Sequence, residues 1–159
     1  MGSKMKVVIQ AGGMGSRLNK VTGGRIPKPL AKLNGKTMLD WQFEQLKRYG
    51  FTDIYLIVGY LGEKIKEYYG DGKKAGIKIS YIQEEEPLGS AGALYYLKEK
   101  IGTKDFILLF GDIIFNIDIN KMEIFHKQKG SMSTLFVHPN SHPYDSDLIV
   151  LNDDCQIVK

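Results

Sequence analysis

Cysteine is almost absent from this chain, and long apolar runs are missing. The single cysteine, Cys155, has no second cysteine with which to form an internal disulfide. A cysteine-poor chain fits a reducing compartment, and we expect the protein to be cytoplasmic. No apolar run approaches the roughly 20 residues that a membrane-spanning helix needs, and residues 7–9 are too few for the apolar core of a signal peptide. We therefore expect no membrane partner.

Positive charge is too weak and too scattered for a typical nucleic-acid binder. The net charge is +4 over 159 residues, and the lysines do not form one basic cluster with aromatic residues between them. A few lysines and arginines that bind phosphorylated small molecules explain this balance as well, so we expect no nucleic-acid partner. Hydrophobic residues make up 43% of the chain, which is enough for a domain that needs no metal or disulfide for its stability.

Strand-like and helix-like patterns alternate along the chain. The continuous apolar run at 106–110 is typical of a strand covered on both faces. Leu39, Phe43 and Leu46 recur at helical spacing, and Thr37 lies where a helix cap is expected. This alternation predicts an α/β fold, with a parallel sheet and helices on both of its faces. The predicted strands are 6–11, 53–58, 77–81, 106–110, 132–137 and 148–151, and the predicted helices are 38–49, 61–69, 90–100 and 120–129.

The loops after the strands are the places to search for a binding site. In parallel sheets, ligands bind beyond the carboxyl ends of the strands, which here means the loops after Ala11, Ile82 and Phe110. We expect one domain over 1–159 that is truncated at its C-terminus, because residues 156–159 resemble the middle of a strand without a closing turn. Residues 1–4, ahead of Met5, resemble a non-native addition.

A glycine-rich loop directly follows the first predicted strand. It reads Ala-Gly-Gly-Met-Gly-Ser-Arg-Leu over 11–18, and Ile-Pro-Lys-Pro-Leu follows at 26–30. Glycines let backbone N–H groups approach an anion closely, and the planar fork of Arg17 suits phosphate oxygens. A P-loop would need Gly-Lys-Ser/Thr at the end of the loop, and a dinucleotide fingerprint would need glycine in place of Leu18. The pattern predicts a phosphate site of another kind, with a plain turn and a solvated arginine as the alternative.

These motifs resemble the signature of the sugar-1-phosphate nucleotidyltransferase family. The family form is Gly-Gly-x-Gly-Thr/Ser-Arg-Leu followed by Pro-Lys-Pro/Ala-Leu. The likeness continues through EEEPLGSAGAL at 84–94 and FGDIIF at 110–115, so it covers nearly the whole chain. It is strongest to the mannose- and heptose-1-phosphate guanylyltransferase branch. The resemblance implies a Rossmann-like α/β/α sandwich with a mostly parallel (mixed) sheet, of which this chain would be the N-terminal two thirds.

The resemblance also implies a reaction and the residues that carry it. An oxygen of a sugar 1-phosphate would attack the α-phosphorus of a nucleoside triphosphate, so that pyrophosphate leaves and an NDP-sugar forms. Arg17 would stabilise charge on the departing pyrophosphate, and Lys28 would bridge phosphates near the reaction centre. The implied nucleotide-binding residues are Ala11, Gly12, Gly13, Gly15, Ser16, Glu84, Gly89 and Ser90.

Asp112 is the candidate metal ligand. It follows the most buried predicted strand, and a carboxylate at that edge of the sheet can bind Mg²⁺ against phosphate oxygens. Considered alone, an aspartate after a glycine could equally cap a turn. Relatives usually supply a second metal carboxylate and a lysine for the sugar phosphate from positions that would lie beyond Lys159.

Glu84 is the residue on which the choice of base depends. Many relatives place a glutamine five residues before the glycine that matches Gly89, where it reads the edge of a pyrimidine. In this chain Glu84 stands there. A carboxylate only accepts hydrogen bonds, and guanine presents two donors on one edge, so this position favours GTP. Residues 84–86 could instead form a solvated acidic loop, and Gln83 could read a pyrimidine if the register is shifted by one.

The segment 137–147 resembles a stretch of heptose-1-phosphate guanylyltransferases. It is rich in polar groups suited to a sugar, although it could be a plain polar loop. The favoured function is transfer of GMP from GTP to a sugar 1-phosphate, with D-glycero-D-manno-heptose 1-phosphate as the candidate sugar. The alternatives are a uridylyl-, thymidylyl- or cytidylyltransferase and a non-catalytic nucleotide-sensing module, and an oligomer is possible. Side chains that could bind a transition metal in this segment are His138, His142, Asp145 and Asp147.

Overall fold

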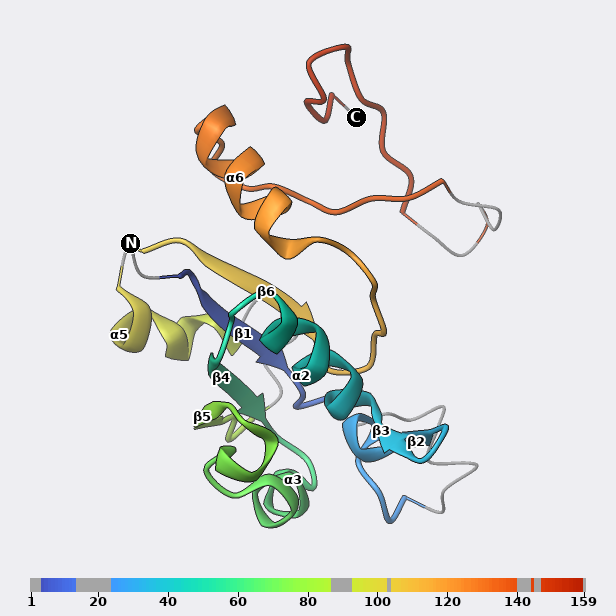
Figure 1. Cartoon of the computed structure of the whole chain (residues 1–159), viewed down its shortest axis with the longest axis vertical. Helices are drawn as coiled ribbons and strands as arrows, with labels where there is room; N and C mark the ends of the chain where they lie inside the picture. The colour runs from blue at the N-terminus through green and yellow to red at the C-terminus, as the bar shows by residue number, and fades with distance from the viewer. Residues whose placement is uncertain are drawn as a thin grey trace. The chain divides into compact units, whose positions relative to one another are not determined.

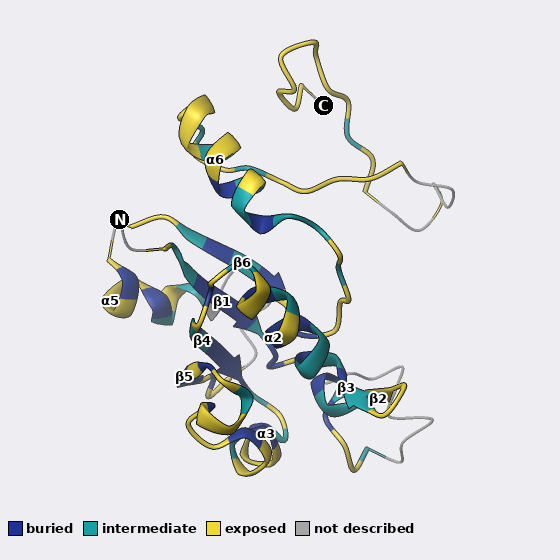
Figure 2. Ribbon diagram, viewed as in Figure 1, coloured by how far each residue is buried: buried dark blue, intermediate teal, exposed yellow. Residues whose placement is uncertain are grey.

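The computed structural model describes residues 4–13, 24–86, 93–102, 104–139, 144 and 147–158 (Figure 1). Contacts divide the chain into two units, Met1–Glu123 and Ile124–Lys159. Every buried residue in the described part of the chain lies in the first unit, as the dark blue segments of Figure 2 show. No helix built from the described residues is both long and apolar enough to cross a membrane.

A parallel sheet forms the centre of the first unit. Its described strands are adjacent in the order β5-β4-β1-β6, and each neighbouring pair runs in parallel. This arrangement confirms the predicted α/β fold. Two of the predicted strands, 53–58 and 106–110, have the observed bounds. The strands are β1 (Lys6–Gln10), β4 (Asp53–Val58), β5 (Lys78–Gln83) and β6 (Phe106–Phe110).

Helices cover both faces of this sheet. Successive side chains of a strand point to opposite faces, and here apolar side chains are buried on both. On one face, residues such as Val7 and Ile9 pack with α2 (Met38–Arg48), α3 (Gly62–Tyr69) and the start of α6 (Ile119–Lys129). On the other face, residues such as Val8 pack with the 3-10 helix η3 (Ala93–Leu97) and with α5 (Lys98–Ile101). The three layers confirm the predicted α/β/α sandwich.

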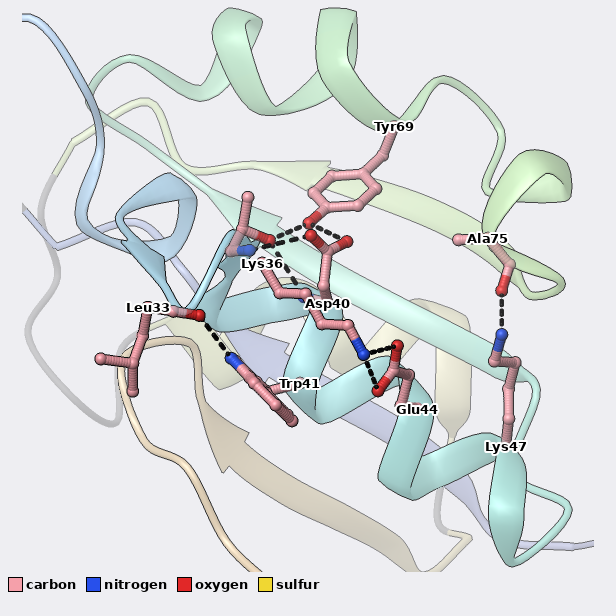
Figure 3. Close-up of polar contacts among 9 residues, drawn as sticks. Leu33, Lys36, Asp40, Trp41, Glu44, Lys47, Tyr69 and Ala75 are labelled. Carbon is pink, nitrogen blue, oxygen red and sulfur yellow. Dashed lines mark hydrogen bonds and ion pairs between the residues drawn. The ribbon is translucent and has the colours of Figure 1, made fainter.

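The helix α2 is tightly fixed at its first turn. The backbone N–H of Asp40 donates to Oγ1 of Thr37 over 3.0 Å, and that of Thr37 donates to Oδ2 of Asp40 over 2.9 Å, which completes a capping box. The hydroxyl of Tyr69 on α3 donates to Oδ1 of Asp40 over 2.9 Å and also contacts Oγ1 of Thr37 (Figure 3). Burial raises the pKa of Tyr69 well above its usual value. The predicted cap is thus confirmed, with a buried tyrosine added to it.

Leucine and phenylalanine side chains explain why α2 lies against the sheet. Leu39, Phe43 and Leu46 are buried at helical spacing, as the sequence predicted. Full burial of each such side chain contributes about 1.5–3 kcal/mol relative to exposure. Before the helix, β2 (Lys32–Leu33) and β3 (Lys36–Thr37) form a short antiparallel hairpin.

Two predicted strands are wrong, and both lie in the second unit. Residues 132–137 form no strand, and 148–151 contribute only an isolated bridge between Leu151 and Ile157. Leu135 and Phe136 are exposed. A strand needs a neighbour that accepts and donates its backbone hydrogen bonds, and the described residues of this unit provide none along 132–137.

Candidate active site

The carboxyl ends of the sheet strands meet at one edge of the first unit. The parallel hydrogen-bond ladder continues for one residue beyond β1, β5 and β6, so the residues after these strands have fixed positions. The predicted site residues Ala11 and Glu84 are therefore neighbours of strand ends, and so is Gly111, which precedes Asp112. The three N–H donors and their carbonyl acceptors are Ala11 with Ile57 (2.8 Å), Glu84 with Val58 (2.8 Å) and Gly111 with Gln10 (2.9 Å).

Glu84 lies against the start of the glycine-rich loop. Its side chain is buried, with 8% of the residue exposed. A Cβ atom on Gly12 would overlap Oε2 of Glu84 and would lie 3.2 Å from the backbone nitrogen of Gly59. A Cβ atom on Gly59, which follows β4, would lie 2.8 Å from the carbonyl oxygen of Gly12. Two glycines thus allow β1, β4 and β5 to bring the loop and a carboxylate together.

Lys28 and Asp112 form an ion pair at the same edge. Nζ of Lys28 lies 2.6 Å from Oδ2 of Asp112, and the two side chains are 42% and 40% exposed. Lys28 belongs to the short 3-10 helix η1 (Lys28–Leu30), whereas Asp112 follows β6. An exposed pair of this kind adds only about 0–1 kcal/mol to stability. Its charges remain accessible to an anion and to a cation.

Gly111 explains how Asp112 comes close to the glycine-rich loop. A Cβ atom on Gly111 would lie 3.1 Å from Cβ of Ala11 and 3.2 Å from the carbonyl oxygen of Gln10. Only a residue without a side chain fits this gap without displacing the end of β1. Asp112 therefore follows a glycine that lies directly against Ala11, where the glycine-rich loop begins.

The chemistry of Asp112 fits Mg²⁺ together with phosphate oxygens. Its Oδ2 atom accepts from Lys28, and the described residues around it include no group of three or more His, Cys, Asp or Glu side chains that could bind a metal by themselves. Mg²⁺ typically takes one or two carboxylates and completes its shell with phosphates and water. One accessible carboxylate beside an accessible ammonium matches that requirement.

Several predicted site residues lie outside the described residues. The structure brings Ala11, Gly12, Gly13, Lys28, Glu84 and Asp112 to one edge of the sheet. Within the acidic stretch, Glu85 and Glu86 are exposed, whereas Glu84 is buried. Gln83 is exposed and its Oε1 accepts from Nζ of Lys66 over 2.9 Å. The predicted residues that fall outside are Gly15, Ser16, Arg17, Gly89 and Ser90.

Sequence reasoning missed two residues that shape this edge. Gly59 follows β4, and the rule that ligands bind after strand ends would have identified its loop. Gln42 lies between Leu39 and Phe43 on α2 and is buried, with 1% of the residue exposed. A polar residue at a core-facing position of a helix was the available signal, because buried polar groups need hydrogen-bond partners.

Comparisons with known proteins agree with this geometry. Residues 6–158 match the family described as "Nucleotidyl transferase". The chain is 40% identical over 120 residues to D-glycero-alpha-D-manno-heptose 1-phosphate guanylyltransferase of Campylobacter jejuni, which covers 76% of this chain and 53% of that protein. It is 30% identical over 167 residues to UTP–glucose-1-phosphate uridylyltransferase of Synechocystis, which covers 97% of this chain and 43% of that protein.

A solved structure shows the same fold. HddC from Yersinia pseudotuberculosis, in a complex with GMP-PN, superposes with a TM-score of 0.69 at 33% identity. The match covers 77% of this chain and 54% of that chain. This chain therefore spans about half the length of the relatives that it matches.

Proposed function

Because the chain belongs to the nucleotidyl transferase family, we propose that it forms the nucleotide-binding part of a sugar-1-phosphate nucleotidyltransferase. The enzyme joins a nucleoside triphosphate to a sugar 1-phosphate and releases pyrophosphate. The observation that carries this proposal is the Lys28–Asp112 ion pair, which lies at the carboxyl edge of the sheet, where Gly111 packs against Ala11 at the start of the glycine-rich loop. At that edge, a lysine can bind phosphate oxygens and a carboxylate can bind the Mg²⁺ that accompanies a triphosphate.

The Lys28–Asp112 ion pair would exchange partners on nucleotide binding. In the free protein, the ammonium of Lys28 and the carboxylate of Asp112 neutralise each other across 2.6 Å. A bound triphosphate would give Lys28 a more highly charged partner, and the carboxylate of Asp112 would then be the group that holds Mg²⁺. Mg²⁺ supplies positive charge that offsets the charge on the phosphates. By its place in the motif, Arg17 stabilises the departing pyrophosphate.

We further propose that the nucleotide is GTP and that Glu84 recognises the guanine. Burial removes the carboxylate from water, where its hydrogen bonds would be weakened by competition. The two donors of guanine, N1–H and N2–H₂, can both donate to one carboxylate, whereas uracil and thymine offer one donor between acceptors. Support comes from relatives that are named as guanylyltransferases and from HddC, which was solved with GMP-PN.

The sugar is a heptose 1-phosphate in this proposal. The Campylobacter jejuni relative, at 40% identity, acts on D-glycero-alpha-D-manno-heptose 1-phosphate according to its name. The polar segment 137–147, which lies partly outside the described residues, carries hydroxyl, amide and carboxylate groups suited to such a sugar.

The substitution Glu84→Gln tests the recognition of the base. Dissociation constants for GTP and UTP are measured by titration calorimetry with Mg²⁺ in the wild type, in Glu84→Gln and in Glu85→Gln. Glu85 is a matched control, because it is the neighbouring carboxylate and is exposed. A hydrogen bond to a charged group contributes about 1.5–3 kcal/mol, so Glu84→Gln should weaken GTP binding by roughly 10- to 150-fold.

The control should behave as the wild type. If Glu84→Gln keeps the wild-type preference for GTP, Glu84 does not read the base. If the wild type itself prefers UTP, the guanine proposal is wrong and the chain belongs with the uridylyltransferases. The assignment to the nucleotidyl transferase family is unaffected by that result.

A further inference from the structure

Gln42 on α2 bridges the two sides of the Asp112 turn. Its Nε2 atom donates to the carbonyl oxygen of Phe110 and to that of Ile113, each over 2.8 Å. These carbonyls flank Gly111 and Asp112 in the chain. The two hydrogens of one amide group are therefore used to fix the backbone immediately before and after the candidate metal ligand.

The position of Gln42 makes these bonds unusual for a core residue. It is 1% exposed on the apolar face of α2, where Leu39, Phe43 and Leu46 surround it in the sequence. An apolar side chain of similar volume would fill the same space without the cost of burying an amide. Its Oε1 atom is buried without a hydrogen-bond partner among the described residues. Burying this amide therefore costs free energy, and the hydrogen bonds that its Nε2 donates both go to the turn around Asp112.

The backbone of the turn itself is held on one side more firmly than on the other. The N–H of Gly111 donates to the carbonyl of Gln10 on β1 over 2.9 Å. The N–H of Ile113 donates to the carbonyl of Phe110 over 3.3 Å, which is long for such a bond. The same helix also anchors the segment of Lys28, because the N–H of Met38 donates to the carbonyl of Ala31 over 3.0 Å, directly after η1. α2 is therefore the common support of both members of the Lys28–Asp112 pair.

We propose that Gln42 is a positioning residue that sets the carboxylate of Asp112 for the metal–nucleotide complex. This inference rests on the proposed function, in which Asp112 binds Mg²⁺. Partners that orient a metal ligand typically change metal affinity by 10- to 100-fold when they are removed. Gln42 does so from the protein core, through the backbone of the turn and without contact with the ligand.

The test is a comparison of GTP binding with and without metal. The ratio of the dissociation constant in EDTA to that in Mg²⁺ measures how much the metal strengthens binding. It is determined by titration calorimetry for the wild type and for the Asp112→Asn, Gln42→Met and Gln45→Met variants. Methionine keeps the length of glutamine but removes both donors. Gln45 is the control, because it lies on the same helix and its Oε1 is also buried without a partner among the described residues.

We expect Asp112→Asn to abolish the strengthening by metal and Gln42→Met to reduce it by roughly 10-fold or more. Gln42→Met should keep the wild-type affinity in EDTA, and Gln45→Met should match the wild type in both conditions. Asp112→Asn should bind GTP in EDTA at least as tightly as the wild type, because its side chain no longer pairs with Lys28 or repels the phosphates. A purely structural role for Gln42 would instead lower the affinity equally in EDTA and in Mg²⁺. If Gln42→Met is too unstable to measure, Gln42→Asn, which withdraws the amide by one methylene, undergoes the same comparison.

The outcomes separate this inference from the proposed function. If Asp112→Asn loses the metal effect while the Gln42 variants keep it, the positioning role is wrong and the proposed function stands. If the wild type binds GTP without any metal effect, or Asp112→Asn retains it, the metal role of Asp112 is wrong and the role of Gln42 is overturned with it.

Discussion

Replacing Gly59 with alanine should disturb the edge where β1, β4 and β5 end. The added Cβ atom would lie 2.8 Å from the carbonyl oxygen of Gly12, 3.2 Å from its Cα and 3.3 Å from Oε2 of Glu84. Carbon–oxygen contacts in proteins are usually about 3.3–3.6 Å, so Gly12 must move by roughly half an ångström. The backbone of Gly59 does not have a positive φ angle, so alanine adds steric overlap without backbone strain.

The magnitude follows from the tightness of this contact. Overpacking a well-packed site usually costs about 1–3 kcal/mol. In a domain of this size, each kcal/mol lowers the melting temperature by about 2–4 °C. Because the displaced residue is Gly12, the affinity for GTP should fall together with the stability.

Urea unfolding and calorimetric titration with GTP measure the two effects. Gly13→Ala is the matched control for stability, because no atom of the described residues lies within 4 Å of the added Cβ. We expect it to change the free energy of unfolding by less than about 0.5 kcal/mol. A Gly59→Ala protein with wild-type stability and wild-type GTP affinity would refute the packing argument at this edge.

Three further predictions concern stability. Tyr69→Phe removes the hydroxyl that donates to Asp40, so it should lower the free energy of unfolding by about 1–3 kcal/mol in a denaturant titration; an unchanged value would contradict the assigned bond. Burial raises the pKa of Tyr69, so on raising the pH its hydroxyl loses a proton in the unfolded state before it does so in the folded state. The free energy of unfolding should therefore fall as the pH rises above about 10, and it should fall less in Tyr69→Phe. Asp112→Asn should change thermal stability by at most about 1 kcal/mol, because its ion pair with Lys28 is exposed, and a larger loss would mean that the pair is structural.

The sequence predicted those parts of the fold that depend on local patterns. The apolar run at 106–110 and the capping residues of α2 carry the information for a buried strand and a helix start within a few neighbouring positions. The loops beyond the strands followed from the parallel topology, and the structure confirms that Ala11, Glu84 and Asp112 lie near one edge of the sheet.

The features that could not be predicted depend on residues distant in the sequence. The hydrogen bonds from Gln42 reach carbonyl groups 68 and 71 residues further along the chain. No local sequence pattern encodes contacts over that separation. The close approach of Gly59 to Gly12 has the same origin. The predicted strand at 132–137 failed for a related reason, because a local sequence pattern shows that a segment can form a strand but does not supply its partner.

The most direct test of the proposed function is the thermal stability of the chain with Mg²⁺ and each of GTP, UTP, dTTP, CTP and ATP. A nucleotide present at about a hundred times its dissociation constant should stabilise the fold by about 2.7 kcal/mol. We predict that GTP gives the largest shift and that Asp112→Asn reduces it. A larger shift with a pyrimidine nucleotide would contradict the guanine assignment, and no shift with any of the five would contradict a nucleotide site in this chain.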